Sequence, residues 1–278
     1  MKVPDYTSRN KAMAILAIGL FLLVCSPAQS QTNTPPWIFV SSPDWFNHDI
    51  ADLSGSTQGI SKAPGWDDNI TNGVNGVTPQ MEQLYVDIVS EMASYNPQAI
   101  TIAGDLINGR WFNDATLDMF DPGTRNRTTA INTAANIYYS WHKRLFNTNG
   151  INLILGAVGD HEIGDGDWPE GSDKANHVNT MKQAFSQNMV DPLGLPTQVY
   201  GVNSRPTGTG YEQGTYAYKL NNVLFVSIDV WRHDGPADVI SPHNRAVKPE
   251  VTAPVLQWLD AMLDAADTDT TTDHVIVQ

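Results

Sequence analysis

The residues best suited to chemistry are three aspartates, each of which closely follows a short apolar run: Asp44, Asp105 and Asp160. Carboxylates gathered in one crevice repel each other, and the usual physical resolution is a bound cation, or two cations that share a bridging carboxylate. His161 directly follows Asp160 and adds an imidazole to the set. The pattern therefore predicts a metal site with carboxylate and imidazole groups.

The apolar runs before these aspartates predict buried strands of an α/β protein. The runs lie at 37–42, 99–103 and 151–158, and they alternate with amphipathic helical patterns. In α/β sheets, ligands bind in the crevice beyond the carboxyl ends of the strands. We therefore expect the three aspartates to meet there.

Further elements are predicted along the rest of the chain. Thr78 and Pro79 indicate a helix start, and a second helix is expected near 129–146. Pro254 opens a third helix, which follows an apolar strand at 223–230. The first helix is expected to bury six side chains: Met81, Leu84, Tyr85, Ile88, Val89 and Met92. The third is expected to place six apolar side chains on one face: Val255, Leu256, Leu259, Met262, Leu263 and Ala266. Residues 274–278 read as the start of another strand.

Two motifs resemble those of calcineurin-like phosphoesterases and purple acid phosphatases. Gly104-Asp105-Leu-Ile-Asn108-Gly109 is similar to the GDxx(D/N) motif, and Gly159-Asp160-His161-Glu162 is similar to the GNH(D/E) motif. The resemblance spans roughly Trp37 to Gln278. It implies a layered α/β/β/α sandwich, with two sheets packed face to face and helices outside, as a phosphoesterase domain over 31–278.

The resemblance also implies a role for each matching residue. Asp44 matches the first metal-binding Asp, and Asp105 matches the carboxylate that bridges two divalent metal ions. Asp160 stands where the family has a metal-binding Asn, and His161 matches the histidine that orients or protonates the phosphate ester. Asn108 stands where relatives place an Asp or a metal-binding Tyr. The implied activity is hydrolysis of a phosphorylated small molecule or another phosphoester.

Three departures from the family pattern bear on the metal. The first motif lacks the histidine of DxH, which His48 or Asn47 could replace. Asp160 in place of Asn adds a negative charge. The family's later His and its GHxH segment are absent, so we expect the domain to be incomplete at its C-terminus. The ion could be Mn, Fe, Zn, Mg or Ca, and an oxygen-rich site favours Mn, Mg or Ca.

The N-terminus and the overall charge limit the location and the partners. Residues 1–30 have the charged start, apolar core and small residues of a secretory signal, with cleavage expected after Ser30. We therefore expect a secreted or periplasmic protein without a membrane span after signal cleavage. The apolar core is shorter than the roughly 20 residues of a stable membrane helix. The formal net charge of −14 argues against nucleic-acid binding.

Other interpretations of these residues stay open at this point. The acidic loop at 160–173 could bind calcium structurally, so a non-catalytic calcium-binding surface or adhesion module on the same fold is the main alternative. His233 could line the pocket. Four tryptophans in loops could either stack on a substrate or pack in the core: Trp45, Trp111, Trp168 and Trp231. Three histidines are expected at the surface: His142, His177 and His243.

Overall fold

The computed structural model describes residues 36–45, 49, 79–109, 111, 126–164, 173–231 and 249–278. From Ile38 to Gln278 the chain forms one compact unit. The expected signal segment at 1–30, His48, His233, His243 and Trp168 lie outside the described residues. Among the helices in the described part, none has the length and apolar character that crossing a membrane requires.

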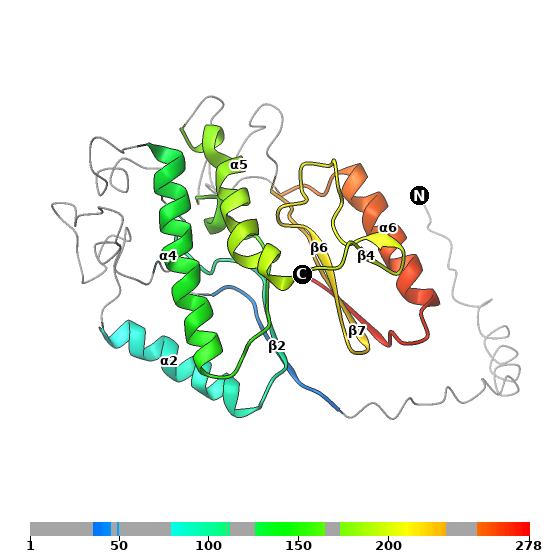
Figure 1. Ribbon diagram of the computed structural model, residues 1–278, viewed down its shortest axis with the longest axis horizontal. Helices are drawn as coiled ribbons and strands as arrows, with labels where there is room; N and C mark the ends of the chain where they lie inside the picture. Colours follow the sequence, from blue (N-terminus) through cyan, green and yellow to red (C-terminus); the bar gives the residue numbers. More distant parts are fainter. Residues whose placement is uncertain are drawn as a thin grey trace, which may run out of the picture. The chain divides into compact units, whose positions relative to one another are not determined.

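The first sheet has three parallel strands, and each predicted aspartate follows one of them in the sequence (Figure 1). Its strands are β1 (Phe39–Ser42), β2 (Ala99–Ile102) and β3 (Ile154–Gly156), in the order β1-β2-β3. The central strand β2 is buried at every position, which is why it lacks the apolar and polar alternation of a half-exposed strand. Because the three strands are parallel, their carboxyl ends reach the same edge.

Helices connect these strands, as parallel pairing requires. The helix α4 begins after the N-cap Asn126, whose side chain accepts a hydrogen bond from the backbone N–H of Thr129 at 2.8 Å. The helix α5 continues into a π-helical segment, η3, and a 3-10 turn, η4. The bounds are α2 (Pro79–Ser94), α4 (Arg127–Thr148), α5 (Asp173–Phe185), η3 (Ser186–Val190) and η4 (Asp191–Leu193).

Aromatic contacts join the helices to the end of the sheet. Trp45 lies just beyond β1, with its ring centroid 6.0 Å from Tyr85 of α2 and 5.1 Å from Phe146 of α4. Two turns earlier in α4, Tyr139 lies 5.9 Å from Phe185 of α5. Trp45 is fully buried, so the structure favours packing over substrate stacking for this residue.

A second three-stranded sheet forms from the later part of the chain. The strands β6 and β7 make an antiparallel hairpin, and β8 pairs with β7 in parallel after the helix α6. Thr252 is the N-cap of α6, with a proline in its first turn. The bounds are β4 (Gln198–Val199), β5 (Val202–Asn203), β6 (Tyr216–Leu220), β7 (Val223–Ser227), α6 (Ala253–Thr268) and β8 (His274–Val277).

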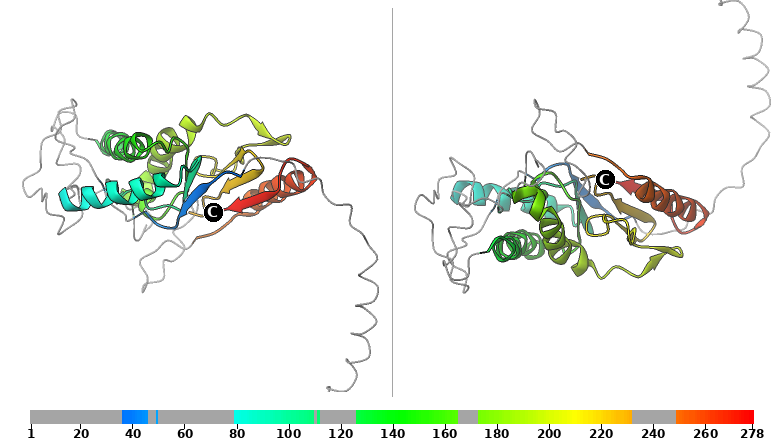
Figure 2. Two further views of the ribbon diagram at one scale, coloured as in Figure 1. Left: turned by 90° about the horizontal axis from the view of Figure 1, so that it is seen from below. Right: turned by 90° about the horizontal axis from the view of Figure 1, so that it is seen from above.

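The helix α6 covers one face of the second sheet. In both views of Figure 2, α6 lies on the side of this sheet away from α4. The core between the helix and the sheet combines residues of β6, β7 and the segment after it with residues of α6: Ala217, Leu224, Val226, Ile228, Val255, Trp258, Met262 and Ala266.

The opposite face of the second sheet contacts the first sheet. Successive strand residues point to opposite faces, so Phe225 points away from the core under α6, and its ring lies 5.2 Å from Phe39 of β1. Tyr216 of β6 donates a hydrogen bond from its Oη to the carbonyl of Gly156 at 2.9 Å. The side chain of Gln278 donates to the carbonyl of Leu155 at 3.0 Å.

Several sequence expectations need correction. His142 was expected at the surface but is fully buried in α4, with its ring 6.0 Å from that of Tyr85. Leu84 and Leu256 were expected on buried helix faces, yet they are 46% and 45% exposed. The strands predicted at 151–158 and 223–230 are shorter: β3 begins only at Ile154, and the last residues of both runs leave the ladder and form loops at the cavity described next.

Candidate metal centre

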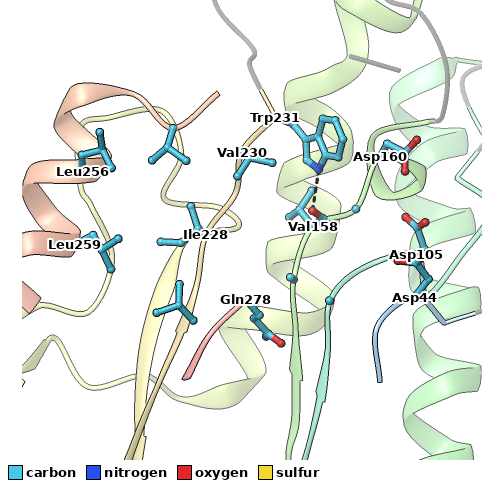
Figure 3. Close-up of a pocket in the computed structure, with 15 residues that line it drawn as sticks. Asp44, Asp105, Val158, Asp160, Ile228, Val230, Trp231, Leu256, Leu259 and Gln278 are labelled. Atoms are coloured by element: carbon cyan, nitrogen blue, oxygen red, sulfur yellow. Dashed lines mark hydrogen bonds between the residues drawn. The ribbon is translucent and has the colours of Figure 1, made fainter. Parts of the chain in front are cut away.

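One cavity beyond the carboxyl ends of the parallel strands is lined by all three predicted aspartates (Figure 3). Asp44 follows β1, Asp105 follows β2, and Asp160 follows β3. The cavity has a volume of about 450 Å³. The parallel strand order thus brings together three carboxylates that lie far apart in the sequence.

The tightest group of potential metal ligands combines Asp105, Asp160 and His161. Each offers one ligand atom, and these atoms lie within 4.8 Å of one another. His161 begins the 3-10 turn η2 (His161–Ile163), so its position depends on the loop directly after β3. Two carboxylates and an imidazole form a donor set that suits divalent cations.

The imidazole of His161 is oriented by a backbone carbonyl. Its Nδ1 lies 3.0 Å from the carbonyl oxygen of Asn108. Since a carbonyl can only accept a hydrogen bond, Nδ1 carries a proton in this contact, and Nε2 is the nitrogen that can act on a bound group. Asn108, a predicted metal ligand, thus contributes its main chain to the site through this bond.

The loops after β2 and β3 approach each other very closely. Asp105 has a φ of +60°, which is uncommon for a residue other than glycine, and Gly104 before it has a φ of +117°. A Cβ on Gly159 would lie 2.0 Å from Asp105 Oδ1 and 2.7 Å from Asp105 N. Glycine at position 159 therefore allows the Asp105 carboxylate to reach its place.

Glu162 holds these two loops together. Its Oε2 accepts hydrogen bonds from the backbone N–H groups of Asp105 and Gly159, each at 2.8 Å, and its Oε1 accepts one from Leu106 at 2.8 Å. Burial and, to a smaller extent, the nearby Asp105 raise the pKa of Glu162 to about 8, while the three backbone donors oppose the shift. The glutamate fixes the position of Asp105 relative to the β3 loop.

The charge around Asp105 favours a bound cation. Burial is the largest cause that raises the pKa of Asp105 to about 6; Asp160 and Asp44 also raise it, while His161 lowers it. The carboxylates therefore lie close enough to repel each other in their charged forms. A cation bound among them would relieve this repulsion.

The remaining wall of the cavity is mostly apolar. Figure 3 shows Leu256 and Leu259 of α6 on the side opposite the carboxylates, and Trp231 lies between these leucines and the carboxylates. The indole Nε1 of Trp231 donates a hydrogen bond to the carbonyl of Val158 at 2.8 Å. This bond ties the segment after β7 to the segment after β3, so the wall and the acidic group are joined.

A buried ion pair supports that wall. Lys182 of α5 lies 2.7 Å from the carboxylate of Asp229, and neither side chain is exposed to solvent. Lys182 also donates a hydrogen bond to the carbonyl of Trp231, and the backbone N–H of Trp231 donates to Asp229 Oδ1 at 2.9 Å. The ion pair therefore determines the path of the chain at Trp231.

The structure places the predicted site residues as follows. Asp44, Asp105, Asp160 and His161 lie at the ends of adjacent strands, whereas Asn108 contacts His161. Trp111 is buried and stacks on Tyr138 at 5.6 Å, and Trp231 lines the cavity.

Three other residues at or near the site were missed in the prediction from the sequence: Asp49, Lys182 and Asp229. Glu162 belongs to the GDHE motif, but the sequence did not indicate that it holds Asp105. Lys182 stands four residues after Val178 and three before Phe185, both of which are buried, so it lies on the apolar face of α5. A lysine on such a face is a signal for a buried partner.

No family model matches the chain, and no curated protein matches its sequence. Among solved structures, the chain is similar to a crystal structure of a dimetal phosphatase from Danio rerio. The identity is 16%, the TM-score is 0.44, and the match covers 88% of this chain and 69% of that chain. The function of this chain is therefore inferred from its own site residues.

Proposed function

We propose that this protein is a metal-dependent hydrolase of phosphoric esters, of the calcineurin-like metallophosphoesterase type. The observation that carries the proposal is the group of Asp105, Asp160 and His161, whose ligand atoms lie within 4.8 Å of one another after adjacent parallel strands. The same residues belong to the GDxxN and GDHE motifs. In this proposal, the two sheets and their helices form the layered α/β/β/α sandwich of that type.

Asp44, Asp105 and Asp160 are the described residues that would hold the cations, with His161 beside them. Two divalent cations, when bound, would neutralise phosphoryl charge and lower the pKa of a bound water. The mutual repulsion of the carboxylates and the mixed oxygen and nitrogen donors fit divalent cations, with Mn, Fe, Zn, Mg and Ca as the candidates.

The protein's own residues would position the ester and move a proton. His161, whose Nδ1–H is held by the carbonyl of Asn108, would orient the ester or protonate the leaving oxygen with a second proton carried on Nε2. The apolar wall formed by Trp231, Leu256 and Leu259 would receive the organic part of the substrate. Glu162 would keep Asp105 in place through its bonds to the backbone.

The test uses the Asp105→Asn variant, with Asp260→Asn, at an exposed position of α6, as a matched control. We expect wild type and Asp260→Asn to hydrolyse p-nitrophenyl phosphate with added Mn²⁺ and to lose this activity with a chelator. Asp105→Asn should lose metal binding and activity together, each by on the order of 10- to 100-fold or more.

Two outcomes would contradict the proposal. Metal content that is unchanged in Asp105→Asn would remove Asp105 from the site. Calcium binding by the wild type without turnover of any phosphate ester would instead support a non-catalytic calcium-binding surface or adhesion module.

We also propose that the protein is exported, with residues 1–30 removed as a signal peptide. The charged start, the apolar core and the small residues Ala28 and Ser30 support this. Mass spectrometry of the protein from the external or periplasmic fraction should show an N-terminus at Gln31. Recovery from the cytoplasm alone with the first residues intact would contradict it.

A further inference from the structure

A buried carboxylate outside both motifs lies close to the proposed site. Asp49 is 4% exposed, and both of its oxygens accept hydrogen bonds. Oδ1 accepts from the backbone N–H of Asn108 at 2.9 Å, and Oδ2 accepts from the indole Nε1 of Trp111 at 2.9 Å. A carboxylate with two buried donors is held firmly, and so are the groups that donate to it.

The residue that Asp49 holds is the one that orients the histidine. The N–H of Asn108 donates to Asp49, and the carbonyl of Asn108 accepts from His161 Nδ1 at 3.0 Å. Gly109 follows with a φ of +68°, and a Cβ there would lie 1.7 Å from the carbonyl oxygen of His161. The main chain at 108–109 is therefore packed against His161 on one side and bonded to Asp49 on the other.

We infer that Asp49 is a positioning residue for His161. By holding the N–H of Asn108, it holds the carbonyl that keeps the His161 proton on Nδ1 and fixes the orientation of the ring. The catalytic consequence rests on the proposed function, whereas the orientation of the ring follows from these hydrogen bonds alone. Asp49 acts through Asn108 and does not contact the reacting groups.

A purely structural role for Asp49 would give a different pattern of effects. Asp49 also holds Trp111, which stacks on Tyr138 of α4, so a change at Asp49 also disturbs the core. The Trp111→Phe variant removes the indole donor but leaves the bond from Asn108 to Asp49 in place. The Asp49→Asn variant places an amide that has a single acceptor oxygen between two N–H donors. Comparison of the two variants therefore separates the link to Asn108 from the link to the core.

The first experiment is ¹⁵N NMR of the His161 ring in metal-free protein, which requires no enzymatic activity. We expect the wild type and Trp111→Phe to show a protonated Nδ1 and an unprotonated Nε2 when the ring is neutral. Asp49→Asn should show a mixture of the two tautomers. A wild-type ring protonated on Nε2 would overturn the inference, even if the Asp49 variant does not fold. An unchanged tautomer in a folded Asp49→Asn protein would also overturn it.

The second experiment measures turnover of p-nitrophenyl phosphate. Asp49→Asn should lower kcat by on the order of 10- to 100-fold with little change in KM, while Trp111→Phe keeps the wild-type kcat. Equal losses of kcat in both variants would assign Asp49 to the core and overturn the inference. A change of tautomer in a protein that hydrolyses no phosphate ester would support the positioning role and contradict the proposed function.

Discussion

The carboxylate of Asp105 depends on a glycine that faces it across the two site loops. In Gly159→Ala, the new methyl group would meet Asp105 Oδ1 at 2.0 Å and the backbone N of Asp105 at 2.7 Å. Because backbone atoms cannot move aside easily, we expect a loss of about 1–3 kcal/mol in the free energy of unfolding. Metal affinity should also fall, since Asp105 must shift.

The matched control for this change is Gly150→Ala. Gly150 has a φ of +86°, but a methyl group added there would meet no atom within 4 Å, so its cost should come from backbone strain alone, at about 1 kcal/mol. Urea denaturation and metal titration of both variants measure the two effects. Normal metal affinity in Gly159→Ala would show that the approach of the two loops does not position Asp105.

The raised pKa of Glu162 predicts an unusual dependence of stability on pH in the metal-free protein. Burial raises its pKa from 4.5 to about 8 in the folded state, so the folded protein binds more protons than the unfolded chain between these values. Stability should therefore be greatest at low pH in this window and should fall as the pH rises toward 8. Asp49 and Asp105, with pKa values raised by burial to about 7 and about 6, act in the same direction.

Urea denaturation in the presence of a chelator tests this dependence. Between pH 5 and pH 8, the free energy of unfolding should fall by at least about 1.4 kcal/mol, which corresponds to one pKa unit. The fall should be smaller in Glu162→Gln than in Glu82→Gln, a change at an exposed position of α2. A metal-free protein whose stability rises over this range would contradict the prediction.

Asp105 could be predicted as a candidate metal ligand from the sequence because a strand, a glycine and the aspartate are adjacent there. The roles of Asp49 and Glu162 could not be predicted in the same way, because each acts on backbone N–H groups about 56 to 59 residues away along the chain. Backbone groups are the same in every residue, so no side-chain pattern marks the partner. Such a role becomes visible only when the loops are placed in space.

At the scale of elements, the pair of Lys182 and Asp229 joins α5 to the segment after β7. Lys182→Met would leave the Asp229 carboxylate buried without its cation, and we expect a loss of about 3–5 kcal/mol in the free energy of unfolding. Adding Asp229→Asn should recover part of this loss, since the amide is neutral and its oxygen still accepts from the N–H of Trp231. A double-mutant cycle measured by urea denaturation gives the coupling energy.

Additive effects of the two changes would contradict the prediction. A second cycle on the ion pair of Asp191 and Arg205, which lies at 2.6 Å and is partly exposed, is the control. Its coupling energy should be much smaller, on the order of 1 kcal/mol or less, because solvent screens exposed charges.

The helices and strands could be predicted to within a few residues wherever the apolar pattern was strong. The helix expected near 129–146 is observed as Arg127–Thr148, and the strand expected from residue 274 is observed as His274–Val277. Exposure was harder to predict, as Leu84 shows, because the width of a buried helix face depends on which partners cover it. His142 was expected at the surface but is buried, since it lies against the aromatic rings of Tyr85 of α2 and Trp141 of α4.

At the scale of the whole compact unit, the two sheets form the cavity together. The carboxylates follow strands of the first sheet, whereas Ile228 and Trp231 follow β7 of the second sheet. The contact between Phe39 and Phe225 and the bond from Tyr216 to Gly156 hold the sheets against each other. Any ligand that joins the carboxylates should therefore stabilise the unit as a whole.

Metal binding should raise the stability of the folded protein and do so more strongly at high pH. Mn²⁺ at about 100 times its Kd should add about 2.7 kcal/mol to the free energy of unfolding if only the folded state binds it. The gain should be larger at pH 8 than at pH 5, because bound metal requires deprotonated carboxylates, and burial raises the pKa of Asp105 to about 6. Thermal unfolding with Mn²⁺ and with a chelator measures the gain at each pH. Asp105→Asn should show little gain at either pH, whereas Asp260→Asn should behave as the wild type. A gain of equal size in Asp105→Asn would mean that the ion stabilises the protein from another position.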